Sequence, residues 1–193
     1  EAAFGSQDAL AWYERILRMD ARVASTDFLL EPKLDGLTVV LHYENGVFTL
    51  GATRGDGIVG EDITANLRTI PSLPLRIPAI PGGNPAPQHI VFRGEVFINK
   101  SDFLALNAEL EKRDEKVYLN PRNTAAGSLR QLDPAITASR PLKFFLYQIL
   151  ESSEPLPQTQ SGILDYIAGF GLPVNHLRWH AANIEEVIEI CEK

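Results

Sequence analysis

The sequence is poor in the residues that cross-link small domains through disulfides or bind structural metals, with one cysteine and four histidines among 193 residues. A single cysteine, Cys191, can form neither an internal disulfide nor a cysteine-based zinc site, so we expect a reducing compartment, the cytoplasm. No stretch approaches the roughly 18 apolar residues of a membrane span, and no basic segment leads into an apolar signal region. The chain begins at Glu1 and has one methionine, Met19, from which we expect a piece of a longer protein.

The composition is that of an ordinary folded protein, with 45% hydrophobic and 22% charged residues. This excludes the disordered and fibrous classes, and the length suits one domain with a core or two small lobes. The net charge of −7 argues against a protein whose role is to coat nucleic acid. The charge is uneven, however, because residues 112–143 carry a local +4 and residues 144–193 a local −5. Such asymmetry would let an anionic ligand bind on one side, although a solvated surface that merely varies explains it equally well.

Apolar spacing and turn signals predict a mixed α+β fold around an antiparallel sheet. Asn45-Gly46 predicts a two-residue hairpin turn, and the Pro/Gly-rich residues 71–89 and the residues 151–160 are expected to form loops. Helices are expected over 7–24, 61–67 and 101–113 (with Ser101 as the cap), after the Asn120-Pro121 cap, up to about 171, and after Asn183. Strands are expected over 37–43, 47–54, 90–98, 143–150 and 174–179.

The hairpin predicts an apolar face with charged residues at its rim. A two-residue turn pairs residues whose numbers sum to 91, so Leu37 would face Arg54. The apolar pairs between them would be Val39–Ala52, Leu41–Leu50 and Tyr43–Phe48. If the preceding segment is extended straight into this strand, Glu31, Lys33 and Asp35 share one face and Lys33 lies at the same end as Arg54. Charges at the rim of an apolar face favour a ligand pocket, whereas a solvent-facing edge strand is the alternative.

Lys33 is the candidate for chemistry in this cluster. A neighbouring arginine favours the neutral amine and therefore a nucleophile, while the carboxylates of Glu31 and Asp35 favour the charged ammonium. Lysine as nucleophile and lysine as an electrostatic phosphate clamp both remain open at this point.

Three further candidates lie later in the chain. Glu95 interrupts an apolar strand and needs a hydroxyl, amine or metal partner, or else pairs with an arginine for structure alone. Arg122 and Arg130 are spaced to share one helical face, which suits bidentate phosphate contacts or simply a basic surface helix. Tyr147 offers a flat ring for a base, or is an ordinary core aromatic.

Together these residues resemble the adenylation domain of bacterial NAD-dependent DNA ligases. The matching segments occur in order over nearly the whole chain: Glu31-Pro32-Lys33-Leu34-Asp35-Gly36, Ala52-Thr53-Arg54-Gly55-Asp56-Gly57, Gly60-Glu61-Asp62-Ile63-Thr64, Arg93-Gly94-Glu95-Val96-Phe97 and the run from Asn120 to Pro134. The long run, which begins Asn-Pro-Arg-Asn, is highly specific. Lys-x-Asp-Gly alone indicates only the wider nucleotidyltransferase superfamily.

The resemblance implies a nucleotidyltransferase fold, an ATP-grasp-like antiparallel core with flanking helices, and a role for each site residue. Lys33 would attack the adenylyl phosphate of NAD, giving lysyl-AMP and nicotinamide mononucleotide. Glu31 would read the adenine amino group and Tyr147 would stack on the ring. The other residues implied in the nucleotide and phosphate sites are Asp35 and Glu95 (ribose, lysine or metal-bound water), Gly36 in the lysine motif, Arg54 (ribose or phosphate), and Arg122 and Arg130 (phosphates of AMP or nicked DNA).

The implied cofactors and partners are NAD, Mg²⁺ bridging phosphate oxygens, and nicked double-stranded DNA, whose 5′-phosphate receives AMP before sealing. We expect a monomer without membrane association, and zinc only in the remainder of the parent protein. Residues 1–193 would be a partial adenylation domain without the nicotinamide-binding subdomain, the later lysine motif, the oligonucleotide-binding fold, the zinc finger and the later domains. Alone it is expected to be incompetent for ligation. The alternatives are a catalytically inactive nucleotide- or DNA-binding module and an ATP-using relative.

Overall fold

The computed structural model describes residues 5–57 and 59–193, which divide into two compact units. The first unit comprises Glu1–Lys33 and His176–Lys193, and the second comprises Leu34–Asn175. Within the described residues, no helix has the length and apolar character needed to cross a membrane.

In its described residues the first unit contains two α-helices, one 3₁₀ helix and a two-stranded sheet. Helix α1 (Ser6–Met19) packs on α7 (Ile184–Cys191), and strand β1 (Phe28–Leu30) pairs antiparallel with β6 (Trp179–Ala181). The Phe28 ring lies edge-on to the rings of Trp12 and Tyr13. Asn183 caps α7 by accepting the Glu186 N–H at 2.9 Å, which confirms the predicted helix start.

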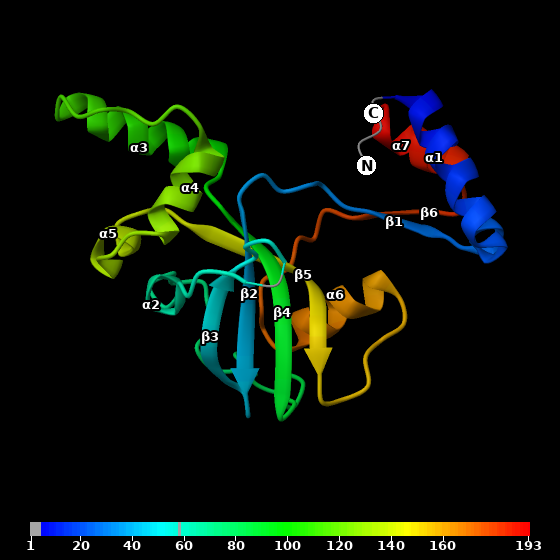
Figure 1. Ribbon diagram of the computed structural model, residues 1–193, viewed down its shortest axis with the longest axis horizontal. Helices are drawn as coiled ribbons and strands as arrows, with labels where there is room; N and C mark the ends of the chain where they lie inside the picture. The colour runs from blue at the N-terminus through cyan, green and yellow to red at the C-terminus, as the bar shows by residue number, and fades with distance from the viewer. Residues whose placement is uncertain (1–4, 58) are drawn as a thin grey trace. The chain divides into compact units, whose positions relative to one another are not determined.

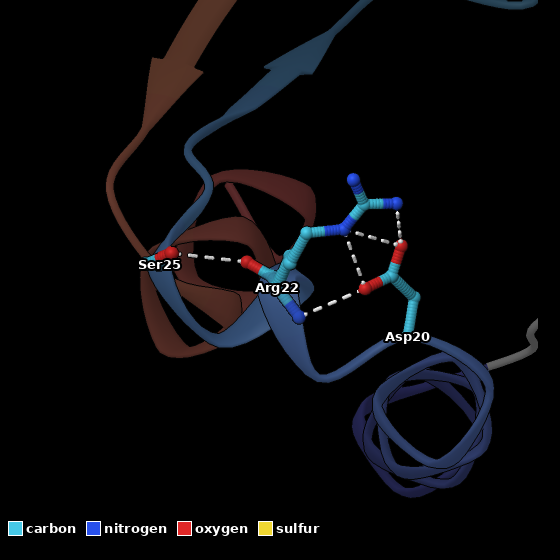
Figure 2. A network of polar contacts seen from close by, with 3 residues as sticks. All are labelled: Asp20, Arg22 and Ser25. Atoms are coloured by element: carbon cyan, nitrogen blue, oxygen red, sulfur yellow. Dashed lines mark hydrogen bonds and ion pairs between the residues drawn. The ribbon is translucent and has the colours of Figure 1, made fainter.

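The prediction of one continuous helix over residues 7–24 is wrong, because the chain leaves the α-helix at Asp20. Asp20 has an extended backbone, and its carboxylate accepts the Arg22 backbone N–H and the Arg22 Nε–H, as Figure 2 shows. This side chain caps a separate 3₁₀ helix, η1 (Ala21–Ser25), in which the Ser25 hydroxyl donates to the Arg22 carbonyl. A short carboxylate competes locally with helix continuation, so the apolar spacing overestimated the helix.

The second unit is built on a four-stranded antiparallel sheet in the order β3-β2-β4-β5 (Figure 1). The strands are β2 (Leu37–Glu44), β3 (Val47–Thr53), β4 (His89–Phe97) and β5 (Lys143–Ser152). One face is covered by α6 (Gln160–Gly169), whose Leu164 and Ile167 are fully buried, and the following Phe170 contacts Phe92. The α+β class with an antiparallel sheet is therefore confirmed.

The other helices described in the second unit are α2 (Thr64–Leu67), α3 (Lys100–Lys112), α4 (Pro121–Leu129) and α5 (Pro134–Ala138). Figure 1 shows α3, α4 and α5 gathered at one end of the four-stranded sheet. Asn120 caps α4 as predicted, whereas α3 is capped by Asn99 and not by Ser101. The sequence analysis missed α5, although Asp133-Pro134 is the same kind of cap followed by proline.

Two further boundaries differ from the predictions. Helix α2 begins at Thr64 and not at residue 61, because Asp62 forms a bridge with Ala52 and its carboxylate accepts the Thr64 N–H. The strand expected over 174–179 is absent there: Val174 makes a single parallel bridge to Leu146, and β6 begins at Trp179.

The predicted hairpin register holds only next to the turn. Tyr43 pairs with Phe48 as predicted, but His42 pairs with Leu50 and Val39 with Thr53, because Thr49 is an extra residue in β3. A bulge of this kind moves every later residue to the opposite face. Leu50 is consequently exposed, Thr53 is buried, and the predicted Leu37–Arg54 pair does not form.

A histidine between two carboxylates lies on the second unit's sheet and predicts a pH effect on stability. The His89 Nδ1 lies 2.7 Å from a Glu44 carboxylate oxygen, and its Nε2 lies 3.3 Å from a Glu151 carboxylate oxygen. The pKa of His89 is raised, chiefly by the hydrogen bond with Glu44. A raised folded-state pKa stabilises the fold below the unfolded value of about 6.5, and that contribution is lost as the pH rises through the folded pKa. Burial, together with the nearby His89, lowers the pKa of His42, which acts in the opposite direction.

The measurement is therefore made with His42→Gln as the reference protein. Its denaturant midpoint is expected to fall between pH 6 and 8, whereas the midpoint of the His42→Gln/His89→Gln protein should stay nearly level over that range. Parallel curves for the two proteins would show that the contacts of His89 with Glu44 and Glu151 do not contribute.

Candidate functional site

The face of the four-stranded sheet opposite the apolar core carries Glu95, one of the polar residues singled out from the sequence. Thr38 pairs with Glu95 and Val40 with Arg93, in alternation with the fully buried Val39 and Leu41 of the core face. Because successive side chains in a strand point to opposite faces, Thr38, Glu95 and Arg93 share the second face. This face, and not the apolar one expected from the hairpin, holds the candidate site.

Glu95 is held at the start of β2 by two donors. Its side chain is 8% exposed, Oε1 accepts the Gly36 backbone N–H at 3.2 Å, and Oε2 accepts the Thr38 hydroxyl at 2.9 Å. A buried carboxylate needs such donors. The carboxylate therefore has a fixed orientation next to the segment that follows Lys33 in the chain.

Gly36 is required where β2 meets β4. A Cβ at this position would lie 2.1 Å from the Val96 carbonyl oxygen and 3.1 Å from the Glu95 Cγ. Since a carbon cannot approach an oxygen to which it is not bonded so closely, only glycine permits this pairing. The glycine of the lysine motif thus places both its own N–H and the Glu95 side chain.

Tyr147 lies near Glu95 on the same face. Partial burial, with a smaller contribution from the Glu95 charge, raises the pKa of Tyr147, while Thr38, Arg93 and Arg54 act on it in the opposite sense. Glu95 pairs with Phe145, two residues before Tyr147, so the tyrosine belongs to the face that bears Glu95. Tyr147 is half-buried, so one part of the side chain remains open to solvent.

Arg54 follows β3 at the same end of the sheet. Its backbone N–H donates to the Thr38 carbonyl at 3.2 Å, and its exposed side chain acts electrostatically on Tyr147. Arg54 is therefore opposite Thr38 and not opposite Leu37. The bulge at Thr49 is the cause, and it brings the guanidinium to the face that bears Glu95.

The two arginines predicted to share a helical face have separate partners. Arg122 donates from Nη1 to Asp35 at 3.1 Å, and Arg130 donates from Nε to Glu61 at 2.6 Å. Helix α4 ends at Leu129, so Arg130 lies beyond it. The side chains of both ion pairs are about half-exposed or more, and exposed pairs contribute little to stability, so a phosphate can replace either carboxylate at small cost.

Three other basic residues between 112 and 143 also have side-chain partners. Lys112 pairs with Glu109 and Lys143 with Asp102, while the Arg140 guanidinium donates to the Tyr118 hydroxyl and lies over its ring.

Glu31 and Lys33 belong to the first unit, where Lys33 ends the first of two chain segments and has an exposed side chain. The segment 31–35 has no regular secondary structure, because β1 ends at Leu30 and β2 begins at Leu37. The chain therefore does not run as one strand from residue 31 into the hairpin. Asp35 and Gly36, which follow Lys33 directly in the motif, belong to the second unit.

Sequence reasoning missed Thr38, Arg93 and Gln148 at this site. Thr38 could have been found from the alternation of polar and apolar residues along β2. Arg93 donates from Nη1 to the Gln148 side-chain oxygen at 3.0 Å, a contact that depends on the β4–β5 register. Among the described residues there is no cluster of three histidine, cysteine or acidic side chains able to hold a metal ion.

Comparisons with known proteins identify the family of this chain. The profile of the family described as the NAD-dependent DNA ligase adenylation domain matches residues 1–193. Similar curated proteins named DNA ligase come from Chloroflexus aggregans (47% identity over 99% of this chain and 29% of the relative) and Roseiflexus castenholzii (45%, 99% and 28%). A Brucella canis DNA ligase is 47% identical over 91% of this chain and 24% of its own length. The chain thus spans less than a third of these relatives.

Proposed function

We propose, because the chain belongs to the NAD-dependent DNA ligase adenylation domain family, that its second unit binds the adenylate half of NAD and that Lys33 accepts the AMP group. The observation that carries this proposal is the cluster of Gly36, Thr38 and Tyr147 around the oriented carboxylate of Glu95. The same proposal includes the assignment of the fold as a nucleotidyltransferase core.

The proposed reaction is one phosphoryl-type transfer. The neutral Nζ of Lys33 attacks the adenylyl phosphorus of NAD, a P–N bond forms, the P–O bond to nicotinamide mononucleotide breaks, and the amine loses a proton. Such transfers depend chiefly on positioning and on stabilising charge on the phosphoryl oxygens. In a complete ligase the AMP would then pass to the 5′-phosphate of nicked double-stranded DNA.

Each site residue has a role in this proposal. Tyr147 stacks on the adenine, Glu31 accepts from its amino group, and Glu95 accepts from a ribose hydroxyl. Arg54 approaches the ribose or the phosphate. Arg122 and Arg130 exchange their carboxylate partners for phosphate oxygens of AMP or DNA, which are bidentate acceptors of the same kind.

Mg²⁺ is part of the proposal as a phosphate-bound ion. Mg²⁺ keeps several waters and binds through substrate phosphates with one or two carboxylates, so it does not need a protein cage. The exposed carboxylate of Asp35 fits that requirement, since its present partner is an exposed arginine. When bound, the ion would neutralise charge on the phosphate.

The proposal predicts binding of AMP by the 193-residue chain, measured by calorimetry. Tyr147→Ala is expected to weaken binding about tenfold, because a base stacked on an aromatic ring gains roughly 1–3 kcal/mol. Tyr147→Phe retains the ring and is the matched control, with an expected change of less than about twofold. Glu31→Ala should also weaken binding. If Tyr147→Ala and Glu31→Ala both leave the affinity of the wild type unchanged, the nucleotide lies elsewhere.

A further inference from the structure

A β-bulge in β5 lies at Tyr147, on the face of the sheet that bears Glu95. Gly94 pairs with Leu146, but the next residue of β4, Arg93, pairs with Gln148, so Tyr147 is an extra residue. Bulges of this kind re-aim side chains and bend the strand. The opposing glycine accommodates the distortion, because a Cβ at Gly94 would lie 2.5 Å from the Phe145 carbonyl oxygen.

The apolar pattern of β5 requires a bulge but does not decide which residue is extra. Phe144, Leu146 and Ile149 are all buried, which is a spacing of two followed by three, so one residue must be inserted between Leu146 and Ile149. Either Tyr147 or Gln148 could pair with Arg93 under that pattern. The choice decides whether the tyrosine occupies a regular ladder position or the bulge.

The hydrogen bond from Arg93 Nη1 to the Gln148 side-chain oxygen, at 3.0 Å, selects one of these two registers. It joins the side chains of the first pair after the bulge, across the strands. Within the described chain, the Arg93 Nε is buried and has no hydrogen-bond partner. An unpaired buried donor destabilises the fold, so the hydrogen bonding of the guanidinium does not by itself explain its position.

We infer that Arg93 is a positioning residue, which, through its hydrogen bond to Gln148, holds β5 in the register that directs the Tyr147 ring toward Glu95. Only the use of that ring for adenine rests on the proposed function; the effect on the ring's position does not. Arg93 acts through Gln148 and needs no contact with the nucleotide.

The test compares Gln148→Met with Gln148→Glu in the 193-residue chain. Methionine has a similar length but lacks a good acceptor, whereas glutamate keeps an acceptor for the Arg93 guanidinium. Gln148 is exposed, so both proteins should fold, as circular dichroism will confirm. The readout is the NMR signal of the Tyr147 ring in protein labelled on its five tyrosines, assigned by its loss in Tyr147→Phe.

In Gln148→Met the Tyr147 signal is expected to move most of the way toward that of solvent-exposed tyrosine, and its pKa should fall toward the ordinary value because burial raises it. In Gln148→Glu the ring signal should stay close to that of the wild type. If Arg93 acted only through its charge, the Tyr147 signal would not change in Gln148→Met, because that substitution retains the charge of Arg93. An unchanged Tyr147 signal in Gln148→Met overturns the inference.

The AMP affinity of the same proteins separates this inference from the proposed function. If both hold, Gln148→Met binds AMP about five- to tenfold more weakly and Gln148→Glu binds like the wild type. If the wild type does not bind AMP while the ring still moves in Gln148→Met, the proposed function fails and the positioning role stands. If the wild type binds AMP and the ring does not move, only the positioning role fails.

Discussion

A full-length ligase that contains this chain is expected to form no covalent AMP adduct once Lys33 is replaced by arginine. Arginine preserves the positive charge and nearly the reach of lysine, but its guanidinium is not deprotonated in proteins and cannot attack phosphorus. If Lys33 were only an electrostatic clamp for phosphate, the arginine variant would keep part of the activity. The substitution therefore distinguishes the two roles that the sequence leaves open.

The measurement is intact-mass spectrometry of the full-length protein after incubation with NAD and Mg²⁺. Lys100→Arg is the matched control, since Lys100 is an exposed lysine on the first turn of α3, and this protein should still gain the mass of AMP. An AMP adduct on the Lys33→Arg protein would place the nucleophile at another residue.

Replacement of Gly36 by alanine is expected to destabilise the chain strongly and to disrupt the site at the same time. The added Cβ would meet the Val96 carbonyl oxygen at 2.1 Å, so the start of β2 must move away from β4. That movement lengthens the hydrogen bond from the Gly36 N–H to Glu95 and releases a buried carboxylate from one of its two donors. Overpacking of this kind typically costs about 1–3 kcal/mol in the free energy of unfolding.

Urea denaturation of the 193-residue chain measures this cost, and AMP titration measures the effect on the site. Gly127→Ala is the control, because Gly127 lies inside α4 and a Cβ there meets no heavy atom within 4 Å. That substitution should leave the stability unchanged or raise it by about 0.5–1 kcal/mol. Equal midpoints for Gly36→Ala and the wild type would mean that β2 does not approach Val96 as closely as described.

Local signals in the sequence predicted the parts of the fold that depend on neighbouring residues. Asn45-Gly46 predicted the hairpin turn, and the caps Asn120 and Asn183 predicted two helix starts that the structure confirms. These features depend on backbone conformation and hydrogen bonds within a few residues. The same local reasoning failed at Asp20, whose extended backbone ends α1 and whose carboxylate caps η1.

The candidate site could be named from the sequence but not assembled from it. The motifs identified Asp35, Arg54, Glu95 and Tyr147 as residues of one family's site, and the family is confirmed. The predicted position of Arg54 at the rim of the apolar face was wrong, because an extra residue in β3 reverses the alternation of its side chains.

The sequence by itself therefore determined the turns, the main helix caps, the antiparallel α+β class and the family to which the chain belongs. Only the tertiary structure decided the strand register at the bulges of Thr49 and Tyr147, the face that bears Glu95, and the carboxylate partners of Arg122 and Arg130. The physical reason is that a bulge needs only one inserted residue, whose position depends on contacts with another strand. Thr49 and Tyr147 occupy those positions because of cross-strand pairing, which no local pattern specifies.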